Sequence, residues 1–232
     1  METNLLPIEE KKASFLARTL TRKGKVLAVR SWQPDDLMEI DVHLPGLNMH
    51  NWKDAQHIKC RVGSFAYRDY TPAAWDAETS TCTLFIDAGH NGAGSTWARS
   101  LKAGDTLYYL GAASSHQQPA ADKRLVFVGD QSAIGHFAAL QQLAGEDAAI
   151  EGAVALEHEA YGEQLKAFLP KLAVQGLQKG ADSLENWLQA FPYDEQSVFY
   201  LVGNTAMVVA LRKLLKQQGY KGQQIKAQGF WR

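Results

Sequence analysis

The sequence predicts a two-domain β + α/β protein, in which an antiparallel six-stranded barrel precedes a parallel sheet covered by helices. Two observations support this prediction. As far as residue 110, short runs rich in β-branched and aromatic residues are separated by turn residues, which is typical of a small antiparallel barrel. Beyond residue 120, strands of buried type alternate with amphipathic helical segments, which is typical of a parallel sheet.

In the first domain, the pattern predicts strands at residues 25–32, 37–44, 57–62, 67–71, 81–87 and 106–110, and one helix at residues 95–101. Turns are expected at Pro34-Asp35-Asp36 and around Gly104. A run of small and polar residues follows Gly111 and is interpreted as a linker. We place the boundary within it, so the predicted domains are residues 1–118 and 119–232.

In the second domain, apolar runs predict strands at residues 125–128, 148–156, 172–176 and 198–202. Helical periodicity predicts helices at residues 132–143, 182–190 and 205–218, the last of them ended by Gly219. The C-terminal Phe230 and Trp231 need a docking place, either on the core or at a ligand pocket, because chain ends otherwise fray.

Composition argues against several classes of protein. A formal net charge of −1 over 232 residues gives no basic field for nucleic acid. Cys60 and Cys82 lie in predicted strands without metal or redox spacing, so they are expected to be buried thiols. The 7 histidines show no metal-ligand spacing either, and no metal site is expected. Without a signal peptide in residues 1–12 or an apolar stretch of about 20 residues, we expect a cytoplasmic protein with no membrane span.

The segment Arg68-Asp69-Tyr70-Thr71 ends a predicted strand and carries chemistry suited to a ligand. Alternation along the strand places Arg68 and Tyr70 on one face and Asp69 and Thr71 on the other. The arginine fork suits phosphate oxygens, the phenol can pack on a planar ring, and Thr71 offers a hydroxyl and a backbone N–H to the ring edge. We interpret the segment as one half of a flavin dinucleotide site. A surface arginine beside a half-buried tyrosine is the alternative.

A glycine-rich turn follows about twenty residues later, with the sequence GAGSTWA from Gly92 to Ala98. Gly92 and Gly94 permit close backbone approach, and Ser95 or Thr96 could cap the following helix. Free N–H groups and the helix dipole make such a terminus an anion site, so the turn is expected to hold the pyrophosphate. An ordinary capped helix is the alternative.

Two loops of the second domain share a pattern of strand, glycine, polar residues and helix. Gly129, Asp130 and Ser132 follow one predicted strand, and Gly203 and Asn204 follow another. Open α/β sheets bind nucleotides at such strand ends, which favours a nicotinamide nucleotide here. Neither loop has the G-x-G-x-x-G fingerprint, so tight strand-to-helix turns remain the alternative.

Taken together, these motifs resemble the siderophore-interacting protein family, which are FAD-dependent ferric-siderophore reductases of the ferredoxin reductase superfamily. The resemblance rests on four segments in the family's order: RDYTP, GAGSTWA, GDQSA and the C-terminal GFWR. It implies a ferredoxin reductase-like fold, with non-covalent FAD in the barrel and NADH, NADPH or a redox protein as electron donor. The implied reaction is reduction of Fe(III)-siderophore, which releases Fe(II).

The resemblance also implies roles for individual residues, although it identifies no certain catalytic side chain. The residues expected to bind FAD are Arg68, Tyr70, Thr71, Asp87, Gly89, Gly92, Gly94, Ser95, Thr96 and Trp231. Those expected to bind the nicotinamide nucleotide are Gly129, Asp130, Ser132, Gly203 and Asn204, with Lys123, Arg124 and His158 as candidates for contact with a ribose phosphate. Lys59, Arg61 and Arg232 are expected to attract an anionic siderophore.

The chain departs from the family pattern at Pro72-Ala73-Ala74, where many members have a second arginine, and at Asn204, where many carry an acid.

Two other functions stay open at this point. One is a flavin oxidoreductase with another acceptor, such as a quinone, free flavin or a protein. The other is a flavin- or siderophore-binding module without nicotinamide-linked activity.

Overall fold

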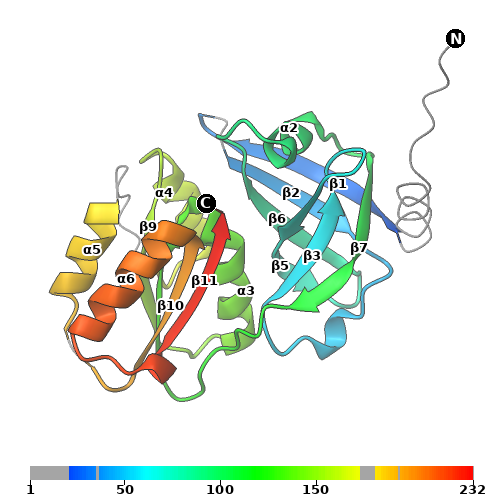
Figure 1. Cartoon of the computed structure of the whole chain (residues 1–232). Helices are drawn as coiled ribbons and strands as arrows, with labels where there is room; N and C mark the ends of the chain where they lie inside the picture. Colours follow the sequence, from blue (N-terminus) through cyan, green and yellow to red (C-terminus); the bar gives the residue numbers. More distant parts are fainter. Residues whose placement is uncertain (1–20, 35–36, 173–180, 193, 232) are drawn as a thin grey trace, which may run out of the picture.

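The computed structural model describes residues 21–34, 37–172, 181–192 and 194–231. Two β-sheets lie side by side, each with its own helices, and helix α3 lies between them (Figure 1). Residues 115–123 connect the two sheets. Tyr200 holds this connection by two hydrogen bonds. Its hydroxyl donates to the Gln118 carbonyl at 2.7 Å and accepts from the Ala120 N–H at 2.9 Å. The predicted boundary at residues 118 and 119 falls within the connection and stays a prediction.

The first sheet is antiparallel and has seven strands, in the order β4-β3-β7-β1-β2-β6-β5. Their bounds are β1 Arg22–Trp32, β2 Leu37–His43, β3 Gln56–Arg61, β4 Tyr67–Tyr70, β5 Pro72–Asp76, β6 Thr81–Asp87 and β7 Thr106–Ser114. A short 3-10 helix, η1 (Met49–Asn51), precedes β3, and helix α2 (Ala93–Ser100) covers one end of the sheet (Figure 1).

The prediction of six strands was wrong by one, and Pro72 supplies the physical reason. Proline lacks the N–H needed to continue a hydrogen-bonded ladder and is tolerated at the first residue of an edge strand. The chain therefore leaves β4 at Tyr70 and begins β5 at Pro72, which pairs with β6. Since β4 and β5 are the two ends of the strand order and only Thr71 separates them, the sheet curls into a barrel.

Alternating residues of these strands fill the barrel interior. Examples are Ile40, Ile58, Leu84 and Tyr109, all fully buried in one cluster that the α2 residue Ala98 completes. Cys60 and Cys82 belong to the same cluster and are free, which confirms the prediction of buried thiols.

The second sheet is parallel throughout, in the order β11-β10-β8-β9, with β8 Arg124–Asp130, β9 Ile150–Ala155, β10 Ser197–Asn204 and β11 Ile225–Trp231. Helices α3 (Ile134–Ala144) and α4 (Tyr161–Phe168) pack with one set of strand residues, and α5 (Ala181–Ala190) and α6 (Thr205–Gln217) pack with the other. Phe127 and Tyr200 thus face one helical layer, while their neighbours Val126 and Phe199 face the other. Period-2 alternation in strands buried on both faces explains the predicted α/β class, which is confirmed.

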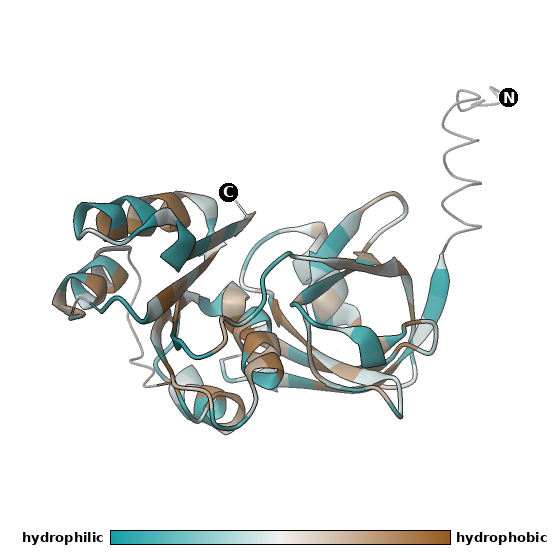
Figure 2. Cartoon of the chain, turned by 90° about the horizontal axis from the view of Figure 1, so that it is seen from below, coloured by the Kyte–Doolittle hydropathy of each residue, from teal (hydrophilic) through white to brown (hydrophobic). Residues whose placement is uncertain are grey.

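The two domains share hydrophobic core. Trp32, Phe85 and Ala73 of the barrel belong to the cluster that contains Phe137 and Ile134 of α3. Figure 2 shows that the helix between the two sheets is mostly hydrophobic. Helix α3 therefore packs against β5 and β6 of the barrel as well as against the parallel sheet.

Local patterns missed three elements. Strand β5 is short and begins with proline, and α4 offers few turns of helical periodicity. Strand β11 was expected only as a docked tail, because its exposed residues hide the alternation, and it pairs in parallel with β10 instead. The linker predicted after Gly111 also begins later, since β7 continues to Ser114. Apart from Leu172, the strand predicted at 172–176 lies outside the described residues.

No helix in the described ranges is both long and apolar enough to cross a bilayer.

Candidate functional site

The register of β3 and β4 determines which face each side chain of the RDYT segment occupies. Cys60 opposes Arg68 and Ile58 opposes Tyr70, so Arg68 and Tyr70 share the face of these core residues. Lys59 opposes Asp69 on the other face. The Tyr70 ring stacks on Trp97 of α2, with 5.7 Å between centroids and 14° between planes.

The Tyr70 hydroxyl is a buried polar group with no hydrogen-bond partner among the described residues. Burial raises the pKa of this phenol above its ordinary value, so it is neutral and can donate a hydrogen bond. A buried hydroxyl without a partner is uncommon in native proteins, and such groups often mark a place that a ligand completes.

The first turn of α2 lies directly against this hydroxyl. A Cβ atom placed on Gly94 would lie 2.6 Å from the Tyr70 hydroxyl oxygen and 3.3 Å from Cγ of Arg68. Gly92 is the N-cap residue, and no described side chain caps the helix or adds an acid to its first turn. Because the first N–H groups of a helix carry partial positive charge, this terminus and the Arg68 guanidinium together suit an anion. Ser95 is buried in this turn and Thr96 is exposed.

The loop between β6 and α2 carries Asp87, Gly89 and His90. The Asp87 carboxylate accepts from the Gly89 N–H at 3.1 Å and lies 3.2 Å from Nε2 of His90. Trp231, at the end of β11, crosses to this loop. Its ring centroid lies 5.1 Å from that of His90, and its Nε1 donates to the Ser132 hydroxyl at 3.3 Å. The C-terminal strand therefore contacts the barrel domain at the end of the parallel sheet.

Asp130 ties together the two glycine loops of the parallel sheet. Its carboxylate accepts from the Ser132 N–H at 2.9 Å and from the Asn204 N–H at 2.7 Å. Gly203 has φ of +129°, and a Cβ there would lie 2.6 Å from the Asp130 carboxylate, so both backbone and space require glycine. Burial raises the pKa of Asp130, although these hydrogen bonds oppose the shift.

Gly129 and Asn204 have local roles in these loops. A Cβ on Gly129 would lie 2.2 Å from the Val202 carbonyl oxygen and 3.0 Å from Phe137, so this glycine permits close packing of β8 on β10 and α3. Asn204 caps α6, since its side-chain oxygen accepts from the N–H groups of Ala206 and Met207 at 3.0 and 3.1 Å.

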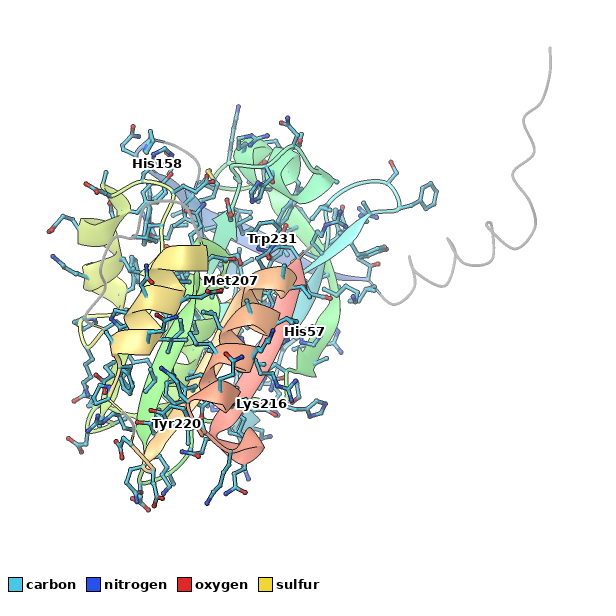
Figure 3. The ribbon with its side chains drawn as sticks, turned by 60° about the vertical axis from the view of Figure 1, so that its left-hand side comes forward. His57, His158, Met207, Lys216, Tyr220 and Trp231 are labelled. Carbon is cyan, nitrogen blue, oxygen red and sulfur yellow. The ribbon has the colours of Figure 1, made fainter. Side chains whose placement is uncertain are left out.

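A cavity of about 480 Å³ lies where these loops meet. It is lined by the β6–α2 loop, by the ends of β8, β9 and β10, and by α6 and the C-terminal strand. The lining residues are Asp87, His90, Asp130, Gln131, Ala155, Leu156, Glu157, Asn204, Ala206, Met207, Ala210 and Trp231. Figure 3 shows Met207 and Trp231 together at one end of the domain, with Tyr220 at the other.

The cavity includes only some of the predicted residues. Asp130 and Asn204 line it, whereas Gly129, Ser132 and Gly203 are not among its described lining residues. Sequence reasoning missed Gln131 and Glu157. Both follow predicted strands, and the carboxyl ends of all strands in a parallel sheet meet at one edge. Their position after a strand could therefore have identified them as cavity residues. His90 and Met207 come from other elements and gave no such signal.

Two of the three basic residues predicted to contact substrate, Lys59 and Arg61, lie away from this cavity. Lys59 pairs with Asp69 at 3.0 Å on the face opposite Arg68 and Tyr70. Arg61 places its guanidinium 4.2 Å from the ring centroid of Tyr108. Arg232 lies outside the described residues. No group of three His, Cys, Asp or Glu side chains in the described part of the chain could hold a metal ion.

Residues 122–232 match the family model for siderophore-interacting protein. The family resemblance is confirmed over this part of the chain. No curated protein matches the sequence. Among solved structures, the siderophore-interacting protein from Acinetobacter baumannii shares 15% identity at a TM-score of 0.77, covering 91% of this chain and 90% of that one.

Two further structures show the same arrangement. The siderophore-interacting protein from Aeromonas hydrophila shares 19% identity, with a TM-score of 0.75 and 91% of each chain covered. A ferredoxin reductase in carbazole 1,9a-dioxygenase shares 17% identity, with a TM-score of 0.75, covering 91% of this chain and 69% of that one. At these identities the comparison shows the fold, which is ferredoxin reductase-like.

Proposed function

We propose that the chain is an FAD-dependent ferric-siderophore reductase that takes electrons from NADH or NADPH. One observation supports this function above the others. Tyr70 and Arg68 of β4 meet the uncapped N-terminus of α2, and the loop that precedes α2 also lines the cavity at the strand ends. A cofactor with a pyrophosphate and a planar ring would thus have one end at α2 and the other near that cavity.

The residues at the first of these positions fit FAD. The unpartnered Tyr70 hydroxyl lies against Gly94, so a phosphate or ribityl oxygen bound at this turn could accept its hydrogen bond. In this proposal, Arg68, the N–H groups of Gly92 to Ser95 and the Thr96 hydroxyl hold the pyrophosphate, and Thr71 faces the ring edge. The Thr96 N–H itself donates to the Gly92 carbonyl at 2.9 Å. Asp87 orders the Gly89 backbone by accepting its N–H. When bound, FAD accepts a hydride and passes electrons on one at a time.

The protein's own residues would control access to that chemistry. Trp231 contacts both Ser132 and His90, so it would cover the junction between the flavin side and the nucleotide side. Reduction of Fe(III) to Fe(II) weakens a chelate of hard oxygen donors, because the larger, less charged ion is held less tightly. Lys59, Arg61 and Arg232 remain the proposed contacts for an anionic siderophore, and the cytoplasmic location remains a prediction.

The decisive experiment is the visible spectrum of the purified protein, followed by addition of NADH or NADPH under anaerobic conditions and then of a ferric siderophore. We expect a yellow protein whose flavin band bleaches with nicotinamide and returns with the chelate as Fe(II) forms. Colourless protein that takes up no added FAD would falsify the proposal.

A second function has one observation in its favour. By the register of β3 and β4, Lys59 and Arg61 lie on the face opposite Tyr70, so neither of these two proposed substrate contacts faces the Tyr70 side. This arrangement favours a flavin oxidoreductase whose acceptor is not an anionic chelate, such as a quinone. Steady-state rates with ferric chelates and with quinones separate the two functions. A binding module would hold FAD and show no reduction by either nicotinamide.

A further inference from the structure

We propose that the cavity at the strand ends selects NADH over NADPH, with Glu157 as the specificity-determining residue. The proposal rests on the function proposed above and specifies its electron donor. The position of the cavity in the sheet, the charge of its walls and an unpaired buried amide support it.

The cavity occupies the nucleotide position of a doubly wound sheet. From β8 the strand order proceeds to β9 on one side and to β10 on the other, so β8 and β10 form the switch point. Asp130 and Asn204 mark the ends of these two strands, and Glu157 follows the end of β9. In dinucleotide-binding sheets, an acidic residue after the neighbouring strand accepts hydrogen bonds from the ribose hydroxyls of NAD, whereas an arginine there accommodates the additional phosphate of NADP.

The charge of the cavity walls opposes that additional phosphate. Asp87, Asp130 and Glu157 are all among the described lining residues, which include His90 but no lysine or arginine. A phosphomonoester carries a charge of about −1.5 to −2 at neutral pH. Placing it beside three carboxylates is unfavourable in a partly enclosed site, because none of the described lining residues is a lysine or an arginine. A ribose diol has no charge and gains donor–acceptor contacts from the same carboxylates.

Gln131 provides an independent sign of a ligand at this wall. It is only 3% exposed and lines the cavity. Its Oε1 accepts from the Glu157 N–H at 3.0 Å, which positions the backbone after β9. Its Nε2 has no hydrogen-bond partner among the described residues. A buried amide donor left unpaired points to a ligand acceptor, such as a ribose oxygen.

None of the basic residues considered for a ribose phosphate is among the described lining residues, and two of them lie at the opposite end of the sheet. Arg124 begins β8 and is 3.3 Å from Glu151 and 3.5 Å from Asp194, at the amino end of the strand. With about 3.3 Å per residue, that end is roughly 20 Å from Asp130. Lys123 lies at the same end, donating to Gln196. His158 packs edge-on against Tyr161, with 5.2 Å between centroids, and is not a described cavity residue (Figure 3).

The test measures binding of oxidised nucleotides to the FAD-loaded protein, because NAD⁺ and NADP⁺ transfer no electrons to oxidised flavin. Calorimetric titration should give NAD⁺ an affinity at least about tenfold higher than NADP⁺. Glu157→Gln should reduce this ratio several-fold, and Glu157→Arg should shift it by roughly tenfold or more towards NADP⁺. Glu159→Arg is the matched control, since Glu159 is exposed and lies two residues further on, and it should leave the ratio unchanged.

Different outcomes overturn the inference and the proposed function. NADP⁺ binding as tightly as NAD⁺ to the flavin-loaded protein contradicts the inference alone, as does an equal effect of the Glu157 and Glu159 variants. If flavin stays bound and neither nucleotide binds, the inference fails together with the nicotinamide-linked part of the function. Failure to bind FAD at all concerns the function and is seen first in the spectrum. Circular dichroism of each variant verifies that it is folded.

Discussion

The N-terminus of α2 and the strand ends of the parallel sheet are both glycine turns, yet their polar groups are satisfied to different degrees. At α2, no described side chain caps the helix, and the Tyr70 hydroxyl beside it lacks a partner. At the strand ends, Asp130 accepts from two loops and Asn204 caps α6. In the proposed function a ligand completes the first turn, whereas most polar groups of the second turn are already paired within the protein. This difference suits a cofactor that stays bound and a co-substrate that leaves.

The largest expected effect tests the ligand-dependent turn. Arg68→Ala should weaken FAD binding by about 1.5–3 kcal/mol, or roughly ten- to hundredfold, because a charge-assisted phosphate contact is lost. Flavin fluorescence during titration measures this affinity. Lys59→Ala is the control, since Lys59 lies on the opposite face of the β3–β4 pair. Equal losses in both variants would mean that β4 does not face the cofactor as proposed.

The two glycines of this turn provide a matched pair. Gly94→Ala should weaken the free energy of FAD binding by about 1–3 kcal/mol, because the added Cβ would lie 2.6 Å from the Tyr70 hydroxyl oxygen. Gly92→Ala should change little, since a Cβ there meets nothing within 4 Å. Flavin occupancy after gel filtration compares the two variants. Comparable occupancy would show that Tyr70 need not remain against α2.

A substitution at the strand ends, where Asp130 holds two loops together, should change the stability of the protein and not its flavin binding. Asp130→Asn replaces one of the two carboxylate oxygens that accept from the loops with an NH2 donor, and it should lower the free energy of unfolding by about 1–3 kcal/mol. FAD affinity should stay within about twofold, because Asp130 is remote from Arg68 in this proposal. Urea denaturation and flavin titration measure the two quantities. A large loss of FAD binding with unchanged stability would reverse the contrast between the turns.

His136 tests the helix that joins the two regions. It is 1% exposed and lies 2.8 Å from the side-chain oxygen of Gln117. Burial lowers its pKa to about 3, whereas the unfolded chain has a value near 6.5. Between these values the unfolded state binds the additional proton, so stability is fully present above pH 6.5 and falls as the pH drops, by up to about 1.4 kcal/mol per unit.

Denaturation curves between pH 7 and pH 4.5 measure this slope. His136→Gln should flatten it, while His50→Gln, at an exposed position, should not. Should the slope persist in His136→Gln, another group is responsible for the acid sensitivity.

The smallest expected effect comes from Tyr70→Phe, which should stabilise the flavin-free protein and weaken FAD binding. Tyr70→Phe removes a hydroxyl that lacks a described partner, so the flavin-free protein should become slightly more stable. FAD binding should weaken by about 0.5–1.5 kcal/mol, as one hydrogen bond is lost. Thermal unfolding with and without FAD separates the two changes. Destabilisation of the flavin-free protein would indicate that the hydroxyl already has a partner there.

Much of the fold was predictable because it follows from local patterns. Alternation in β2 and β6 and the buried run in β8 identified strands, and the period of α6 identified a helix. The seventh barrel strand, β5, was missed because the sequence alone does not separate it from β4. The separation at Pro72 becomes visible only when β5 pairs with β6. Strand β11 was missed because six of its seven residues are not buried, and its place comes from hydrogen bonding to β10.

By itself, the sequence determined the two sheet types, the buried thiols and the two sets of glycine turns, since these depend on neighbours within a few residues. Only the tertiary structure decided that Tyr70 lies against Gly94 and that Glu157 joins Asp87 and Asp130 around one cavity. It also placed Lys59 and Arg124 away from that cavity. The physical reason is that barrel closure, strand order and the packing of α3 set distances between residues far apart in the chain, and no local pattern encodes them.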